Sequence, residues 1–548
     1  MDHKEALEAF KPISLQMDNL SDIPTGSSGY PLLGPHSSKV LYPSTILFLA
    51  AAVYVAWTLL SLAQNVWFHP LSKYPGPIAA RASEWWKVYI EVWKKESMTE
   101  VLSQLHEQYG DVVRTSPNEL HFASAKAYFD IYAPAVRWDK ERVLYHSMGV
   151  DSTSFGYLKY PQAKQRKDVL QPLFSRRAVS GIQGLIRRKL NDYCDTLTQH
   201  NAAKESSNMY LGLRCLTVDT ISAFCFGKSL NALSAPHFQA PIVISMDYAN
   251  PEFLPFKHLP SYRNLIWALP TSISAKLLPD TSGFAQISRL TREQVEAAIA
   301  DPSSLQKYPH QTIYHRLLDP AAQDGRPIPS KDQLLEEAKN LIFAGTDTTG
   351  NTLYVGMWHL MRDLSLQSRL RKEVRAVWPS LTDEPSYETL ANVPLLAAVI
   401  KESLRVSSGV SSPLSRVVSP QGAVIGGHSV PGGTIVGMSA VFLHNNTEIF
   451  PEPHDFNAER WLGPNAKELE RYLVSFSRGP RSCLGINLAH CELYMSFATL
   501  VRRFEMILDE SIEGKLNIDG HGNLMWRDTF LPWFYGQQVK AWCKPVEE

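Results

Sequence analysis

Cysteine is scarce in this sequence, and its placement excludes several classes of protein. The 548 residues include six cysteines and no Cys-x-x-Cys pair, so neither a disulfide scaffold nor a structural zinc site is expected. The 54 basic residues balance 54 acidic ones, so no polybasic bias indicates nucleic acid as a partner. No internal repeat occurs, and a hydrophobic share of 44% excludes wholesale disorder. The composition is that of a large globular protein of enzyme size.

A long uncharged segment near the N-terminus predicts a membrane anchor. Residues 40–63, VLYPSTILFLAAAVYVAWTLLSLA, contain no charged side chain. As a helix they are long enough to cross a bilayer core about 30 Å thick. A buried core helix is the alternative, but over that length it would normally show a polar stripe. We therefore expect a single transmembrane helix over residues 40–63.

The flanks of this segment predict its orientation. More basic residues follow it closely than precede it, so the positive-inside rule puts the large C-terminal body in the cytoplasm. The preceding ones are Lys4, Lys11 and Lys39, and the following ones are Lys73, Arg81, Lys87, Lys94 and Lys95. Residues 1–39 are then a lumenal segment, predicted to be disordered, with a glycosylation sequon at Asn19. Residues 64–80, rich in proline, predict a stiff hinge, and residues 81–548 form the large body that follows it.

The body is predicted to be mainly α-helical with small β-sheets. A long helix is expected from Lys331 to about Arg362, because Ser330 and Gln333 form a capping box and apolar residues follow with helical spacing. Strands are expected at residues 111–114, 417–418, 423–425 and 434–438.

The most informative stretch is Phe476-Ser-Arg-Gly479-Pro-Arg481-Ser-Cys483-Leu-Gly485, followed by an amphipathic helix from Ile486 to about Phe504. A cysteine at a helix N-terminus is favoured as a thiolate, and therefore as a metal ligand or a nucleophile. No base for a nucleophile is visible nearby. Glycines on both sides permit a tight turn and the close approach of a flat cofactor, and Arg481 can pair with a carboxylate.

This stretch resembles the haem-binding loop F-x-x-G-x-R-x-C-x-G of the cytochrome P450 family at every specified position. Three further family motifs are matched in the expected order: Ala344-Gly345-Thr346-Asp347-Thr348-Thr349, Glu402-Ser-Leu-Arg405 and Phe456-Asn-Ala-Glu-Arg460-Trp461. The resemblance covers roughly residues 70–545 and implies that residues 81–548 are a haem-thiolate catalytic domain. It implies the cytochrome P450 fold behind one transmembrane helix, of the microsomal type and most similar to fungal members, on the endoplasmic reticulum.

The resemblance also assigns the catalytic residues. Cys483 would be the axial thiolate of haem b, which favours O–O cleavage. Ala344 and Gly345 would leave room for dioxygen; the alternative for such small residues is tight helix packing. Thr348 and Asp347 would deliver the protons that oxygen activation requires. For Thr348 the alternative is a hydroxyl that bonds back to a carbonyl one turn earlier.

The remaining matches are expected to bind or support the cofactor. Glu402, Arg405 and Arg460 would form a structural ion cluster that fixes the loop leading to Cys483. Arg416 and Arg481 would bind the haem propionates. Lys167 stands where the family often has arginine four residues after tryptophan, and Ala163 replaces that aromatic residue. A lysine still pairs with a propionate, as a point charge without the guanidinium fork.

No GxGxxG site or flavin domain is evident, so the resemblance implies that electrons come from NADPH through a separate membrane-bound reductase, with Arg478 on the docking face. The substrate pocket is expected between residues 144–158, Phe343, Ala344, residues 411–414 and residues 529–531. These residues are largely apolar, which favours a hydrophobic small molecule such as a terpenoid, steroid or polyketide. The leading hypothesis is a monooxygenase of fungal secondary metabolism. The alternatives are a haem-thiolate isomerase or dehydratase without dioxygen chemistry, and a non-catalytic haem protein.

Overall fold

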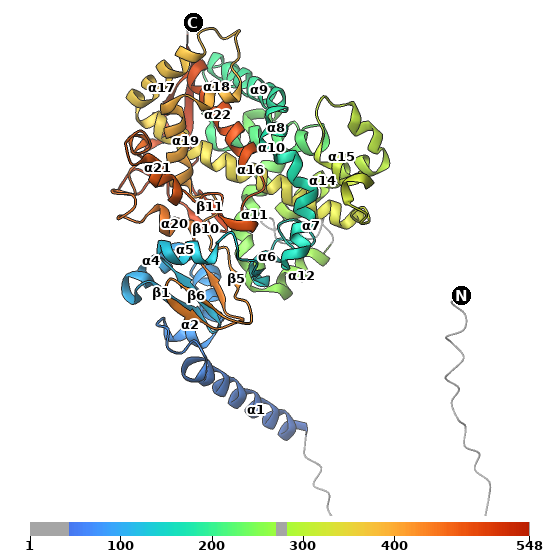
Figure 1. The fold of residues 1–548 in the computed structure, drawn as a ribbon, viewed down its shortest axis with the longest axis vertical. Coiled ribbons are helices and arrows are strands. Elements are labelled where there is room, and N and C mark those ends of the chain that lie inside the picture. Colours follow the sequence, from blue (N-terminus) through green and yellow to red (C-terminus); the bar gives the residue numbers. More distant parts are fainter. Residues whose placement is uncertain (1–42, 270–281, 547–548) are drawn as a thin grey trace, which may run out of the picture. The chain divides into compact units, whose positions relative to one another are not determined.

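The computed structural model describes residues 43–269 and 282–546 (Figure 1). The chain divides into two units, residues 1–59 and residues 60–548. The predicted lumenal segment and Asn19 lie outside the described residues. Helix α1, Pro43–Ala63, covers most of the predicted anchor and carries no charged residue. Within the candidate span Ser44–Phe68, no residue of the most apolar 18-residue stretch is buried, as expected for a helix whose surroundings are lipid.

The second unit is built mostly from helices. Those of nine residues or more are α4 Met98–Tyr109, α7 Tyr160–Leu170, α9 Gln183–Ala202, α10 Met209–Phe226, α11 Pro241–His258, α12 Pro260–Ala268, α14 Ser282–Ala300, α16 Lys331–Arg362, α17 Leu364–Val377, α19 Pro394–Ser407 and α22 Ile486–Arg503. The shorter ones are α2 Ile78–Ala82, α3 Trp85–Val88, α5 Ala125–Ile131, α6 Arg142–Tyr145, α8 Arg176–Ser180, α15 Ile313–Leu318, α18 Tyr387–Ala391, α20 Ala440–His444, α21 Ala466–Leu469 and α23 Glu510–Glu513.

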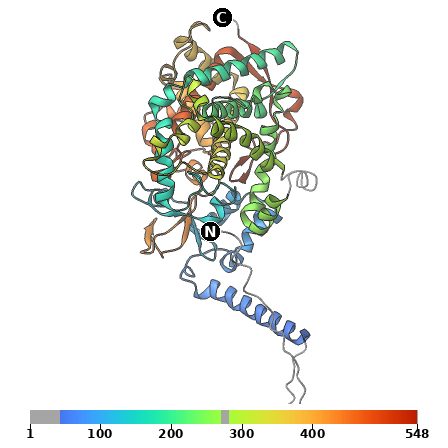
Figure 2. The same ribbon diagram turned by 90° about the vertical axis from the view of Figure 1, so that its right-hand side faces the viewer.

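The long helix α16 organises the core. Its bounds agree with the sequence prediction, and Ser330 and Gln333 form the expected capping box. It crosses the interior of the second unit in both views (Figures 1 and 2) and packs against α10, α14, α19 and α22. Helix α10 is also apolar enough to span a membrane, but every residue in it is buried, so it is a core helix.

Four small sheets complete the fold and confirm the mainly α class. The largest has the order β1-β2-β8-β5-β3, in which only β2 and β8 are parallel. Its strands are β1 Val112–Ser116, β2 Glu119–Phe122, β8 Ile435–Gly437, β5 Arg416–Val417 and β3 Asp139–Lys140. A three-stranded sheet has the order β4 Ser207–Asn208, β12 Lys540–Pro545 and β9 Phe504–Leu508. The two remaining sheets are two-stranded: one pairs β6 Ala423–Ile425 with β7 His428–Val430, and the other pairs β10 Arg527–Thr529 with β11 Leu531–Trp533. Each of the four predicted strands overlaps an observed one.

The predicted hinge, residues 64–80, is tied to the large sheet. The Arg114 amide donates to the Pro75 carbonyl at 2.7 Å. The Arg114 guanidinium donates to the carbonyls of Asn65 and Pro117 at 2.8 and 2.6 Å. A side chain at Gly76 would lie 2.3 Å from the Arg114 carbonyl oxygen, so only glycine allows this approach. These contacts hold the proline-rich segment against β1.

Candidate active site

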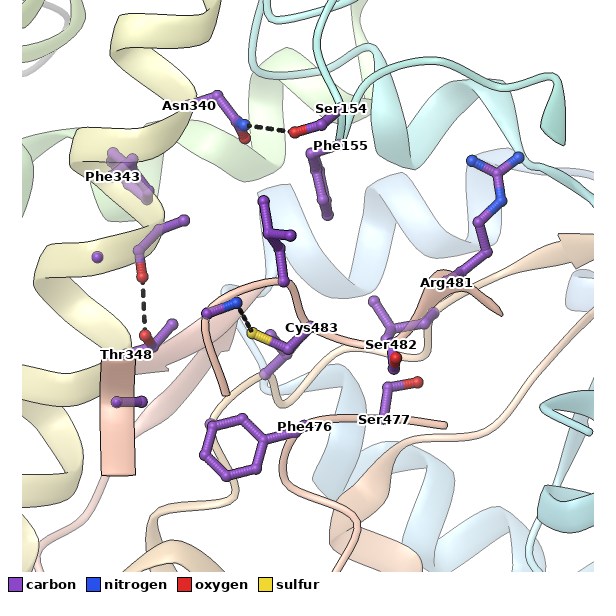
Figure 3. A pocket seen from close by; sticks show the side chains of 18 of the residues that line it. Ser154, Phe155, Asn340, Phe343, Thr348, Phe476, Ser477, Arg481, Ser482 and Cys483 are labelled. Atoms are coloured by element: carbon purple, nitrogen blue, oxygen red, sulfur yellow. Dashed lines mark hydrogen bonds between the residues drawn. The ribbon is translucent and has the colours of Figure 1, made fainter. Parts of the chain in front are cut away.

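A cavity of about 330 Å³ lies between α16 and the loop that precedes α22. Its walls are mostly apolar. Figure 3 shows Cys483 toward one end of this space and Asn340 with Ser154 toward the other. The predicted pocket segments contribute Met148, Val150, Ser154, Phe155, Phe343, Ala344, Ser412, Leu414, Phe530 and Leu531 to the lining. Sequence analysis did not single out Lys140, Ile287, Lys339, Asn340, Val410 and Glu492, which also line it.

The cysteine loop is held by backbone contacts. The Cys483 amide donates to the Phe476 carbonyl at 3.0 Å, which closes the loop. Gly479 has a φ of 72°, and a side chain there would lie 2.7 Å from the Tyr132 carbonyl oxygen, so this turn requires glycine. The Gly485 amide donates to Cys483 Sγ at 3.3 Å. The loop therefore presents the sulfur to the cavity with one N–H directed at it.

The sulfur is the one metal-ligating group in the loop. Burial raises the pKa of the Cys483 thiol, and the Gly485 N–H and the Lys167 charge offset part of that rise. Among the described residues, no group of three or more His, Cys, Asp or Glu side chains is placed to bind a metal ion. A metal at Cys483 must therefore bring its other ligands with it, as the iron of a haem does.

Four cationic side chains lie beside the loop without an acidic partner in the described part of the chain. They are Lys140, Lys167, Arg416 and Arg481, of which only the last three were predicted. Lys167 donates to the Ser482 carbonyl at 3.1 Å, and Arg481 donates to the Leu158 carbonyl at 2.8 Å. Arg416 Nη1 donates to the Tyr145 hydroxyl at 2.6 Å. All of these bonds end on neutral acceptors.

Burial and mutual repulsion perturb this cluster. Burial, followed by the charges of Arg416 and Arg481, holds the pKa of Lys140 well below its usual range. Burial and Arg416 lower the pKa of Arg481 to about 10, and Arg481 Nε has no hydrogen-bond partner among the described residues. Such a cluster is satisfied by a ligand with carboxylates, and the two propionates of haem fit it. No sequence motif marks Lys140, because only the fold brings β3 to this place.

Helix α16 forms the opposite wall. Ala344, Gly345 and Thr348 all line the cavity. Thr348 Oγ1 donates to the Ala344 carbonyl one turn earlier at 2.8 Å, which is the alternative bond expected from the sequence. The Thr348 side chain nevertheless faces the cavity (Figure 3). A side chain at Gly345 would lie 2.6 Å from Ile221 Cγ1. This glycine therefore also permits the close packing of α10 on α16.

Asp347 lies away from the cavity, in the contact between α16 and α10. The carboxyl is fully buried, and Oδ1 accepts from Arg214 Nε at 2.8 Å. Arg214 Nη2 donates to Asn351 Oδ1 at 2.8 Å. Burial raises the pKa of the Asp347 carboxyl, and Arg214 offsets part of this rise. Sequence reasoning did not identify Arg214, whose partner is 133 residues away along the chain.

The predicted cluster of Glu402, Arg405 and Arg460 is assembled behind the cysteine loop. Glu402 accepts from Arg405 at 2.8 and 2.9 Å and from Arg460 at 3.1 Å. Burial raises the pKa of Glu402, but the hydrogen bonds and charges of the two arginines outweigh it and lower the pKa overall. Arg405 also donates to the His444 carbonyl, and His444 Nε2 accepts from the Val474 amide at 3.0 Å. The cluster is thus linked to the chain that leads into Phe476.

Comparison with known proteins agrees with this geometry. Residues 81–528 match the family model described as Cytochrome P450. The cytochrome P450 monooxygenase flvC of Aspergillus flavus is 32% identical over 540 residues, covering 92% of this chain and 97% of the relative. The monooxygenase macH of Penicillium terrestre is 31% identical and covers 90% of this chain and 97% of its own length. The monooxygenase aneF of Aspergillus aculeatus is 30% identical, with 84% and 93% covered.

Proposed function

The chain belongs to the cytochrome P450 family, and from that premise we propose that it is a membrane-anchored haem-thiolate enzyme that oxidises an apolar small molecule of fungal secondary metabolism. The family resemblance is thereby confirmed, and the enzyme is an oxygen-incorporating oxidoreductase. The observation that carries the proposal is the single cysteine sulfur facing an apolar cavity that Lys140, Lys167 and Arg481 also line; with the adjacent Arg416 they form a group of cations for which residues 43–269 and 282–546 supply no acidic partner.

Each part of the site has a role in this proposal. Bound haem supplies the activation of dioxygen. Cys483 provides the thiolate ligand. Lys140, Lys167, Arg416 and Arg481 hold the carboxylates of the cofactor and fix its orientation. The apolar walls exclude water and bind the substrate skeleton.

Proton delivery is assigned to the α16 wall. Thr348 holds a proton at Oγ1 on the cavity surface, where it can be passed to a reacting oxygen. Asp347 follows on the far side of the helix and accepts from Arg214. The Arg214 guanidinium also stacks on the ring of Tyr210, whose hydroxyl donates to the half-buried Asp247 at 2.6 Å. We assign proton delivery to Thr348 and Asp347, with Arg214 holding the Asp347 carboxyl in place.

Electrons are proposed to come from NADPH through a separate reductase of the endoplasmic reticulum, with α1 as the anchor and the body facing the cytoplasm. Arg478, an exposed cation within the cysteine loop, is assigned to the docking face. Replacing Arg478→Glu should weaken reductase coupling at low salt, and unchanged turnover would refute this assignment.

The reduced protein in membranes should give a carbon monoxide difference band at the long-wavelength position of thiolate-ligated haem. Cys483→Ala should abolish that band, whereas Cys491→Ala, a buried cysteine in α22 away from the cavity lining, should retain it. A wild-type band at the position of histidine-ligated haem would contradict the assignment of Cys483. With a reductase, NADPH and substrate present, oxygen uptake distinguishes a monooxygenase from an isomerase or dehydratase.

A further inference from the structure

The end of the cavity remote from Cys483 carries a polar group that the chemistry above does not use. Asn340 lies on α16 in a row with Ala344 and Thr348 at intervals of four residues, so the three share one face of the helix. All three line the cavity. Eight residues of α-helix separate Asn340 from Thr348 by about 12 Å.

The orientation of the Asn340 amide follows from its neighbours. Asn340 Nδ2 lies 3.0 Å from Glu337 Oε1 and 3.5 Å from Ser154 Oγ. The Ser154 hydroxyl itself donates to Glu337 Oε1 at 2.8 Å, so its oxygen is left to accept. A carboxylate only accepts hydrogen bonds, so the Asn340 group that faces it must be the NH2. The carbonyl Oδ1 is therefore turned away from Glu337.

Glu337 is held firmly enough to fix this arrangement. It is fully buried and accepts from Arg166 Nη1 at 3.1 Å and from the Ser154 amide at 3.1 Å. The NH2 group of Asn340 is thus anchored by a buried ion pair. In the part of the chain that the structure describes, no donor contacts Asn340 Oδ1. This wall of the cavity presents a preoriented hydrogen-bond acceptor to a ligand that carries a donor.

A second polar residue narrows the choice of ligand. Lys339 also lines the cavity, and its Nζ donates to the Gly149 carbonyl at 3.1 Å. A cationic amine would be repelled by this lysine. A ketone or a carboxylate offers no proton to Asn340 Oδ1. A hydroxyl group donates one proton and carries no charge, so it suits this end of the cavity.

We propose that the substrate is an apolar alcohol whose hydroxyl group donates to Asn340 Oδ1, while the carbon to be oxidised lies near Thr348 and Cys483. This inference rests on the proposed function, because it takes the Cys483 end as the reacting end. Phe155 and Phe343 lie between the two ends (Figure 3), where they would pack against the substrate skeleton. The hydroxyl and the oxidised carbon are then on the order of 10 Å apart. The enzyme acts after a step that has already installed a hydroxyl group.

Binding to the purified full-length protein tests the proposal without turnover, through the shift of the haem absorption band. The probes are matched pairs that differ by one hydroxyl group: dodecanol and dodecane, farnesol and farnesene, geranylgeraniol and its parent hydrocarbon. For at least one pair the wild-type protein should bind the alcohol about tenfold more tightly than the hydrocarbon, as expected for one buried hydrogen bond. Asn340→Leu should reduce this ratio to between one and two.

The control is Ser154→Ala, which also removes a polar atom from the cavity wall but leaves Asn340 bonded to Glu337, so the preference should persist. Asn340→Ala is the second variant if Asn340→Leu holds no haem, since Glu337 keeps its bonds to Arg166 and Ser154 in both. A wild-type protein that prefers none of the alcohols, or a ratio unchanged in the Asn340 variants, would overturn the proposal. The carbon monoxide band separates the two hypotheses. A normal band with no alcohol preference refutes only the substrate class, whereas loss of the thiolate band refutes the proposed function.

Discussion

Replacing Arg214→Met should destabilise the protein strongly, because it leaves a buried carboxyl without its cation. Arg214 and Asp347 are each about 1% exposed, and their contact of 2.8 Å joins α10 to α16. The variant also loses the bond from Arg214 to Asn351 and the stacking of the guanidinium on Tyr210, 3.6 Å from the ring centre. Removing one partner of a buried ion pair typically costs about 3–5 kcal/mol.

The size of the effect can be measured by urea unfolding of the haem-loaded protein, followed by far-ultraviolet circular dichroism. A loss of about 3–5 kcal/mol shifts the midpoint by about 1 M, given that urea m-values grow with size to about 3 kcal/mol/M or more. Asp347→Asn should also destabilise, because it leaves the arginine charge buried. The double variant should lose less than the sum of the single losses by about 1–3 kcal/mol. A midpoint shift under about 0.2 M, or additive losses, would refute the reasoning.

Three other perturbations have defined outcomes. Glu402→Ala leaves the Arg405 charge buried without its carboxylate, so the amplitude of the carbon monoxide difference band, relative to total protein, should fall severalfold. A normal yield of haem-loaded protein would contradict the structural role of Glu402. Burial raises the pKa of Glu492 to about 8 from an ordinary value of 4.5, so wild-type stability should fall as the pH rises through this window. Glu492→Gln lacks this titration, so between pH 5 and pH 8 its free energy of unfolding should rise relative to that of the wild type by up to about 4 kcal/mol. If the urea midpoints of the two proteins change in parallel with pH, the expectation is contradicted. Lys140→Met relieves charge repulsion in the apoprotein, so the melting temperature of the apoprotein should rise. The same change removes a cation that faces the cofactor, so haem should transfer from the variant to apomyoglobin about tenfold faster than from the wild type. An unchanged transfer rate would exclude Lys140 from the haem site.

Local patterns account for the parts of the fold that the sequence predicted well. The capping box and apolar spacing of α16 lie within one segment, and the loop motif ends where α22 begins. Several strands were not predicted, including β3 and β4, which are two residues each. Such strands form because a distant partner is brought to them, as β5 is to β3, and no local periodicity records that pairing.

In the candidate site, too, residues within compact motifs were predicted and several isolated residues were not. Cys483 and the Glu402–Arg405 pair belong to compact motifs, whereas Arg214, Lys140 and Asn340 are single polar residues in unremarkable surroundings. Their chemistry depends on neighbours more than a hundred residues away, such as Asp347 for Arg214 and Ser154 for Asn340. For Gly345 the sequence left both space for a ligand and tight helix packing open, and the contact with Ile221 shows that this glycine does serve helix packing.

The four cations beside the cysteine loop, which have no acidic partner in the described part of the chain, have a consequence for the stability of the chain without its cofactor. A chain that has closed around this cavity without its prosthetic group confines several like charges at low dielectric, so that state is disfavoured relative to open, hydrated ones. Binding of a dianionic ligand to the closed state alone shifts this balance by mass action. We therefore expect chains that lack haem to populate open states more often and to be cleaved more readily by proteases than chains that hold it.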